Sequence, residues 1–209
     1  LGRVACPPLA GLERIGVGER RCAEHFGWAL KRIVEEDIRT VVIVARWAVI
    51  LPRSAFGREV MEDLHFSREG RRVSVERHHA EVAAALKRTF DALAGRNVVI
   101  LFSIPEVGWD VPMSLAAAVR FGREPPTPPD RATYETRQKK VRDLFAEIGI
   151  PRSGYEIVEP ADFLCGTGTC RVQIDGRLLY SDDDHPSEFG AGILARLLEP
   201  ALRRSAGGG

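Results

Sequence analysis

The sequence lacks an excess of either charge and lacks long apolar runs, and each absence excludes a class of function. Its 209 residues hold 30 Lys and Arg against 29 Asp and Glu, a formal net charge of +1. No basic run with interleaved aromatic residues occurs, so nucleic acid is not expected as a partner. No window approaches the roughly 20 apolar residues that span a bilayer. The first residues, LGRVACPPLAG, also lack the charged start and apolar run of a signal peptide.

Cysteine is scarce, but its count is even. The four cysteines allow three pairings, and their positions favour two local disulfides. Cys6 with Cys22 would close a loop that holds two prolines and several glycines, and Cys165 with Cys170 would pin a short Gly-Thr-Gly-Thr loop. Neither pair has the tighter spacing of zinc knuckles, so no metal is expected, and no other cofactor is expected either. Two disulfides would indicate an oxidising compartment, and free buried cysteines are the alternative.

The chain also lacks an initial methionine and ends in a glycine-rich tail, which indicates a piece of a larger protein. With 44% hydrophobic residues, it is long enough for a substantial core, and we expect one domain over residues 1–209. No repeat with a period of about 20 to 50 residues is visible, which excludes solenoid folds.

Three apolar runs rich in β-branched residues predict strands. Residues 40–47 form the clearest run, with the pattern of a strand buried on both faces of a parallel sheet. Residues 97–104 and 155–158 follow the same pattern. A further strand is expected to end at residues 4–6, because the two prolines that follow cannot supply ladder N–H groups.

Helical segments alternate with these strands. Apolar residues at helical spacing predict helices over residues 22–35, 74–95, 111–121, 130–148 and 187–204. Residues 171–180 predict a hairpin turned at Asp175-Gly176, and residues 51–73 predict a long loop or a small hairpin around Glu69-Gly70. The alternation predicts an α/β fold, a three-layer α/β/α sandwich with a mainly parallel sheet.

An acidic turn with one histidine follows the predicted hairpin. Within residues 178–191, LLYSDDDHPSEFGA, Asp182 and His185 are three positions apart. The carboxylate can fold back onto the imidazole, fix its tautomer and stabilise its protonated form, which is the base-and-orienter half of a nucleophilic triad. The alternative is that the acidic residues are turn and cap residues, and that His185 is an ordinary surface side chain.

Other candidate side chains follow the predicted parallel strands, whose carboxyl ends form the usual site of such sheets. Arg46 can bind a substrate carboxylate or a developing oxyanion, and the alternative is a salt bridge to a nearby acid. Trp47 can stack on a sugar ring, or it can belong to the core. Trp109, in a Gly-Trp-Asp loop, has the same two interpretations and is expected to be more exposed.

Several motifs together resemble one known family. They are CPPL at 6–9, ARW at 45–47, PEVGWDVP at 105–112, the pair Cys165 and Cys170, and LLYSDDDHPSEFGA at 178–191. In order and spacing they resemble the SGNH-type hydrolase domain that is fused to membrane acyltransferase-3 proteins, over essentially the whole chain. The resemblance implies a flavodoxin-like α/β/α sandwich and assigns Asp182 and His185 as two members of a catalytic triad. Asp183 and Asp184 are rival carboxylates that lack the family spacing, and Pro186 replaces the usual leucine.

The family's nucleophile motif is the main departure. The resemblance implies a Gly-Asp-Ser block near the N-terminus, and none occurs in these residues. Either the first strand and its serine lie outside this piece, or this copy lacks the serine; the abrupt start favours the first interpretation. Ser54, Ser103 and Ser153 lie near strands, but none lies in a Gly-x-Ser-x-Gly turn that would expose its oxygen.

The resemblance also implies a function. It indicates the extracytoplasmic domain of an O-acyltransferase, periplasmic or on the outer face of the plasma membrane. The membrane domain of the same polypeptide would deliver an acyl group such as acetyl, and the acceptor would be a hydroxyl of a cell-surface glycan. The alternatives are a carbohydrate esterase and a non-catalytic glycan-binding or regulatory domain.

Overall fold

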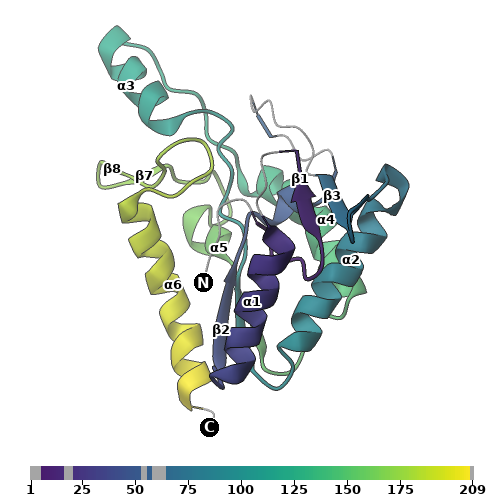
Figure 1. Cartoon of the computed structure of the whole chain (residues 1–209). Helices are drawn as coiled ribbons and strands as arrows, with labels where there is room; N and C mark the ends of the chain where they lie inside the picture. The colour runs from purple at the N-terminus through teal and green to yellow at the C-terminus, as the bar shows by residue number, and fades with distance from the viewer. Residues whose placement is uncertain (1–5, 17–20, 53–55, 58–64, 208–209) are drawn as a thin grey trace.

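The computed structural model describes residues 6–16, 21–52, 56–57 and 65–207. Among these residues, the central sheet has three parallel strands, in the order β2 (Thr40–Val44), β5 (Asn97–Leu101) and β6 (Tyr155–Val158) (Figure 1). The central strand β5 is fully buried from Val98 to Ile100, as expected for a parallel strand covered on both faces.

Strand β2 differs from its prediction. It ends at Val44 rather than at residue 47, and a short 3-10 helix, η1 (Trp47–Ile50), follows. Val42 and Val44 are 38% and 61% exposed, so the expectation that this strand is buried on both faces is wrong for the structure as described. The reason is its position, because β5 is its one hydrogen-bonded neighbour among the described strands.

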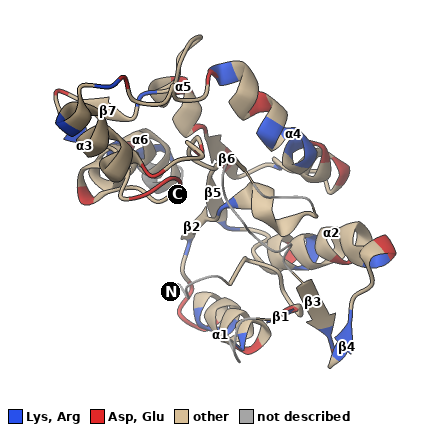
Figure 2. Ribbon diagram, turned by 90° about the horizontal axis from the view of Figure 1, so that it is seen from above, with Lys and Arg blue, Asp and Glu red and all other residues tan. Residues whose placement is uncertain are grey.

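Helices cover both faces of the sheet, which confirms the predicted three-layer α/β architecture. Helices α1 (Cys22–Glu35), α2 (Val75–Ala92) and α4 (Arg131–Glu147) lie on one face, and α6 (Glu188–Gly207) lies on the other (Figure 2). An aromatic cluster fills the first interface: the ring of Phe145 on α4 makes edge contacts with Trp47, Phe90 and Phe102, with centroids 5.1 to 6.0 Å apart.

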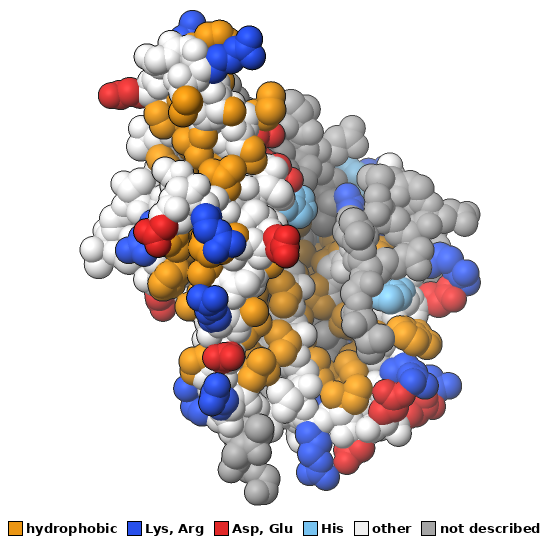
Figure 3. All heavy atoms as spheres, turned by 90° about the vertical axis from the view of Figure 1, so that its left-hand side faces the viewer, with side chains coloured by type: hydrophobic (Ala, Val, Ile, Leu, Met, Phe, Trp, Pro, Cys, Tyr) orange, Lys and Arg blue, Asp and Glu red, His pale blue; other side chains and the backbone are white. Residues whose placement is uncertain are grey.

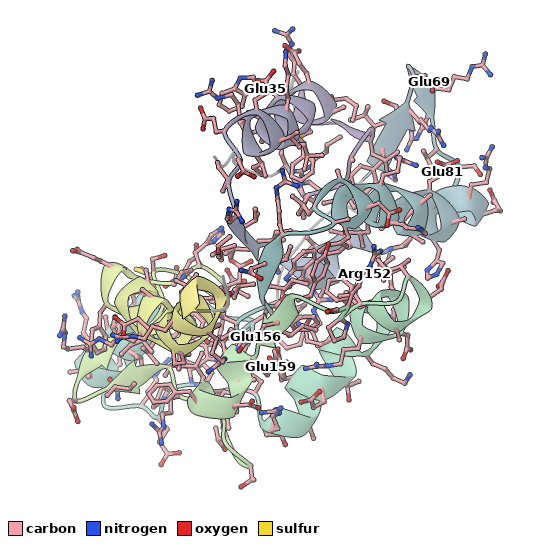
Figure 4. All side chains as sticks on the ribbon, turned by 90° about the horizontal axis from the view of Figure 1, so that it is seen from below. Glu35, Glu69, Glu81, Arg152, Glu156 and Glu159 are labelled. Atoms are coloured by element: carbon pink, nitrogen blue, oxygen red, sulfur yellow. A yellow bond between two sulfur atoms is a disulfide. The ribbon has the colours of Figure 1, made fainter. Side chains whose placement is uncertain are left out.

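Ionic contacts anchor α4 to the end of β6. Glu159, directly after the strand, accepts hydrogen bonds from the Tyr134 hydroxyl and from Arg142 Nη2, the latter at 2.5 Å. Figure 4 shows Glu156 and Glu159 along this segment, and Glu156 pairs with Arg204 of α6. The same strand therefore holds the helices of both outer layers.

The smaller elements include two hairpins. β3 (His65–Arg68) and β4 (Arg71–Arg72) form the hairpin around Glu69-Gly70, and β1 (Glu13–Ile15), which was not predicted, pairs with β3. β7 (Gln173–Ile174) and β8 (Arg177–Leu178) form the predicted hairpin at Asp175-Gly176, both with positive φ.

Two helices remain, and one predicted strand falls mostly outside the described residues. Helix α3 (Val111–Phe121) projects above the sheet (Figure 1), and the short helix α5 (Pro160–Leu164) was not predicted. Met113, Val119 and Phe121 of α3 are at least 60% exposed, and Figure 3 shows hydrophobic side chains over this helix. Of the strand expected at residues 4–6, only Cys6 is described, and it is not in a strand. No helix among the described residues is long and apolar enough to cross a membrane.

Both predicted disulfides are present, Cys6–Cys22 and Cys165–Cys170. They span sequence separations of 16 and 5 residues. A disulfide lowers the conformational entropy of the unfolded chain, and it does so more when it closes a longer loop. Replacing Cys6 and Cys22 by serine should therefore lower the free energy of unfolding by about 3 kcal/mol, and replacing Cys165 and Cys170 should lower it by about 2 kcal/mol. Urea unfolding of the two double variants measures the difference.

A thiol titration of the unreduced, unfolded chain is the control for this prediction. We expect no reactive thiol before reduction and four afterwards. Free thiols in the unreduced chain would contradict both the pairing and the oxidising compartment.

Candidate active site

The site lies on the loop of residues 181–187, here called the site loop, which joins the β7–β8 hairpin to α6. Buried Tyr180 anchors its start, because its hydroxyl donates to the Pro105 carbonyl at 2.9 Å. Ser187 ends it: its hydroxyl donates to the Leu178 carbonyl at 2.6 Å and accepts from Gly190 N–H at 3.0 Å. The serine thus caps the first turn of α6 and ties it to the hairpin.

The segment that follows β5 also holds the site loop. The backbone N–H of Val107 donates to the Asp183 carbonyl at 2.8 Å, and the N–H of Val111 donates to the Asp182 carbonyl at 3.1 Å. Because this segment leaves the carboxyl end of a central parallel strand, these bonds place the acidic turn at the sheet edge where sites form.

His185 is held by two carboxylates. Its Nδ1 lies 2.9 Å from Asp182 Oδ2 and 2.8 Å from Asp184 Oδ1. The other oxygen of Asp182 accepts the backbone N–H groups of Asp184 and His185 at 2.9 and 2.7 Å. The His185 side chain is 72% exposed, so its second ring nitrogen, Nε2, faces solvent and can exchange a proton with a reactant.

The two carboxylates have different environments. The Asp182 side chain is 41% exposed and that of Asp184 only 5%. Burial opposes ionisation of Asp182, but the N–H groups of Asp184 and His185 and the ring itself outweigh burial, so the pKa of Asp182 lies below its ordinary value. Burial raises the pKa of Asp184 to about 6, although Arg46 and His185 favour its ionised form.

An ion-pair network lies behind Asp184. Arg46 Nη1 is 2.6 Å from Asp184 Oδ2, and the same guanidinium donates to Glu106, whose side chain is only 2% exposed. Arg137 of α4 also donates to Glu106, with Nη2 at 3.0 Å from Oε1. A buried carboxylate is stable only when it is paired, and the two guanidinium groups supply that pairing.

A family model identifies the chain. The model of the SGNH domain fused to AT3 domains matches residues 1–200. The chain belongs to this family. Its fold is also similar to that of the lipopolysaccharide acetyltransferase periplasmic domain of Salmonella ser. Paratyphi A, with a TM-score of 0.62 and 14% identity over 95% of this chain and 69% of that one. No curated protein sequence matches the chain.

The structure of this SGNH domain brings together Asp182, His185 and Arg46, all expected from the sequence. Arg46 lies between two buried carboxylates, which is the salt-bridge alternative considered for it. Asp184 was named only as a rival carboxylate, and Glu106 lay within the PEVGWDVP motif at 105–112 without a role of its own. Arg137 gave no local signal, because it is one of many charged residues on α4.

The two candidate tryptophans lie in different environments. Trp47 is fully buried, with its indole N–H donating to the Leu101 carbonyl at 2.9 Å, so it is a core residue and offers no ring face to a sugar. Trp109 is partly buried beside the site loop, and its indole N–H has no hydrogen-bond partner in the described part of the chain. Trp109 therefore stays a candidate substrate contact.

Of the candidate serines, Ser103 and Ser153 make no described contact with His185. Ser103 is buried, and its hydroxyl accepts a hydrogen bond from the backbone N–H of Trp47 at 3.0 Å. Ser153 precedes β6, so it lies at the amino ends of the parallel strands, away from their carboxyl ends. Ser54 lies outside the described residues.

One group of described side chains could hold a metal ion. Asp182, Asp184 and His185 bring ligand atoms within 4.8 Å of one another. In this arrangement, however, Arg46 already pairs with Asp184, and Nδ1 hydrogen-bonds to Asp182 and lies 2.8 Å from Asp184. The geometry suits proton transfer by a held imidazole.

Proposed function

We propose that this domain performs the acyl-transfer step of an extracytoplasmic O-acyltransferase. An AT3 domain of the same polypeptide would supply the acyl group, and a hydroxyl of a cell-surface glycan would accept it. The observation that carries the proposal is His185, whose Nδ1 is held by carboxylates while Nε2 faces solvent at the carboxyl edge of the sheet. Membership in a family fused to AT3 domains supports the acyl donor.

The mechanism proceeds through an acyl-serine. His185 Nε2 takes the proton of the serine hydroxyl as its oxygen attacks the acyl carbonyl, and the negatively charged loop stabilises the imidazolium. Collapse of the tetrahedral intermediate releases the donor, which receives that proton. His185 then takes the proton of the acceptor hydroxyl as it attacks the acyl-serine, and returns it to the serine oxygen. With water as the acceptor, the same steps hydrolyse the ester.

The outer edge of β2, which has no hydrogen-bonded neighbour among the described strands, supports a position for the serine. A cavity of about 310 Å³ lies between α1 and β2, lined by Phe26, Leu30, Val42 and Val44 among other mostly apolar side chains. A further parallel strand at this edge would pair with β2 and cover Val42 and Val44. Its carboxyl end would lie beside Val44, two residues from Arg46, which contacts Asp184. We therefore propose that the strand carrying the nucleophile occupies this edge, supplied by sequence outside the 209 residues.

Labelling with a fluorophosphonate tests the nucleophile. In a longer protein that includes the residues preceding Leu1, we expect one labelled serine upstream of this domain and transfer of the acyl group from a small ester to a glycan. The 209-residue chain should not be labelled. If the longer protein folds but has no reactive serine, the non-catalytic glycan-binding domain becomes the better interpretation. If the ester is turned over without any acylated glycan, the protein is an esterase.

A further inference from the structure

We propose that Asp184, which lies outside the Asp-x-x-His pattern, is a second positioning carboxylate for His185 and the main electrostatic partner of its protonated ring. The catalytic meaning of this inference rests on the proposed function, whereas the interaction itself does not. Nδ1 is 2.8 Å from Asp184 and 2.9 Å from Asp182, but its hydrogen bond is with Asp182, whereas Asp184 contacts the ring as an ion pair. The burial of the two carboxylates also differs.

Burial makes the interaction with Asp184 the stronger one. Its side chain is 5% exposed against 41% for Asp182. Although the ring itself is 72% exposed, water screens the charge of Asp184 less than that of Asp182, so the attraction to Asp184 is the stronger one. Asp182 also uses its second oxygen to close the turn, by accepting two backbone N–H groups. Asp182 thus shapes the site loop, while Asp184 supplies the less screened negative charge.

Asp184 is fixed to the sheet rather than to the site loop alone. Its second oxygen pairs with Arg46 at 2.6 Å, and Arg46 shares the buried Glu106 with Arg137 of α4. Each oxygen of Asp184 therefore has one ion-pair partner, the ring on one side and the guanidinium on the other, and the contact of Oδ2 with Arg46 lacks hydrogen-bond geometry. The two ion pairs hold the carboxylate between the strand end and the imidazole.

The charged side chains around His185 favour its protonated form. Arg46 and Arg137 face the carboxylates of Glu106, Asp182 and Asp184, and Asp183 adds a fourth carboxylate whose charge acts on Asp184. Two positive charges against four negative ones leave a net negative charge, which an imidazolium reduces. Burial raises the pKa of Asp184 to about 6, so this carboxylate is ionised at neutral pH, when His185 must accept the serine proton.

The three consecutive aspartates provide a matched test. Asp182→Asn, Asp183→Asn and Asp184→Asn each remove one negative charge from the same turn, but Asp183 makes no described side-chain contact with the ring. NMR of the 209-residue chain follows the titration of the His185 ring in each variant. Removing a carboxylate disfavours the imidazolium, so the midpoint moves to lower pH. We expect Asp184→Asn to lower it by about one pH unit or more, and by more than the other two substitutions.

The outcomes decide the inference independently of the proposed function. A decrease for Asp184→Asn no larger than that for Asp183→Asn or Asp182→Asn overturns it, and a larger decrease supports it. If Asp184→Asn does not fold, the carbon signal of the Asp184 carboxyl in the unmodified chain decides instead. That signal must follow the His185 titration, and independent titration of the two groups overturns the inference.

Activity adds a readout specific to catalysis. In the longer protein, Asp184→Asn should reduce kcat/KM for a small ester by about 10- to 100-fold, with Asp183→Asn as the control. The acid limb of its pH profile should move to lower pH, because the neutral ring persists there. If the longer protein has no activity with any variant, the proposed function fails while the NMR result still decides the role of Asp184.

Discussion

Replacing His185 by alanine in the longer protein is expected to lower kcat/KM for a small acyl ester by about 10⁴-fold or more. The substitution removes the group that accepts the serine proton and later activates the acceptor hydroxyl. His185 is 72% exposed and makes its side-chain contacts with the acidic turn, so the fold should keep its stability. The measurement is steady-state hydrolysis of the ester, with circular dichroism to confirm folding.

His79→Ala is the matched control for this experiment. His79 is also exposed, lies on α2, and pairs with Glu147 at 2.7 Å rather than with the site loop. We expect this variant to keep full activity. If folded His185→Ala also kept its activity, the assignment of His185 as the catalytic base would be wrong.

Replacing Gly190 by alanine should lower the free energy of unfolding by about 3 kcal/mol. A Cβ at this position would lie 2.0 Å from the Leu179 carbonyl oxygen and 3.0 Å from its carbon, and neither backbone atom can move alone. The absence of a side chain lets the first turn of α6 lie directly against the end of the hairpin. Urea unfolding measures the loss, and the site loop between the two elements should be displaced with them.

Gly192→Ala controls for the general effect of alanine in a helix. Gly192 lies two residues further along α6, and a Cβ there has nothing within 4 Å. This variant should be as stable as the unmodified chain or more stable by up to about 1 kcal/mol, since alanine favours helix more than glycine does. Equal stabilities of the two variants would contradict the close approach of α6 to Leu179.

Much of the architecture could be predicted because it depends on local patterns. The run NVVIL of β5 has no polar residue after Asn97, and only a strand covered on both faces can bury such a run. The turn at Asp175-Gly176 was predictable because both residues tolerate positive φ. The prediction that β2 is buried on both faces was wrong, because burial is not a local property. It depends on neighbouring strands, and a run of valines does not show whether a neighbouring strand is present.

The site was predictable in part. Asp182 and His185 are three residues apart, so their contact is a local property of a turn. Trp47 and Trp109 could not be distinguished from the sequence, because both follow strand ends and only packing buried the first. Arg46 had two interpretations, and its partners Glu106 and Asp184 are distant in sequence, 60 and 138 positions away.

The sequence by itself determined the α/β class, the two disulfides and the pairing of Asp182 with His185, because each of these follows from residues near one another in the chain. Only the tertiary structure decided that Asp184 is buried and paired with Arg46, and that Arg46 and Arg137 share Glu106. Those contacts join the ends of β2 and β5, the helix α4 and the site loop, and their energies depend on burial. Burial belongs to the assembled fold, so the spacing of charged residues in the chain could not reveal which of three adjacent aspartates is shielded from water.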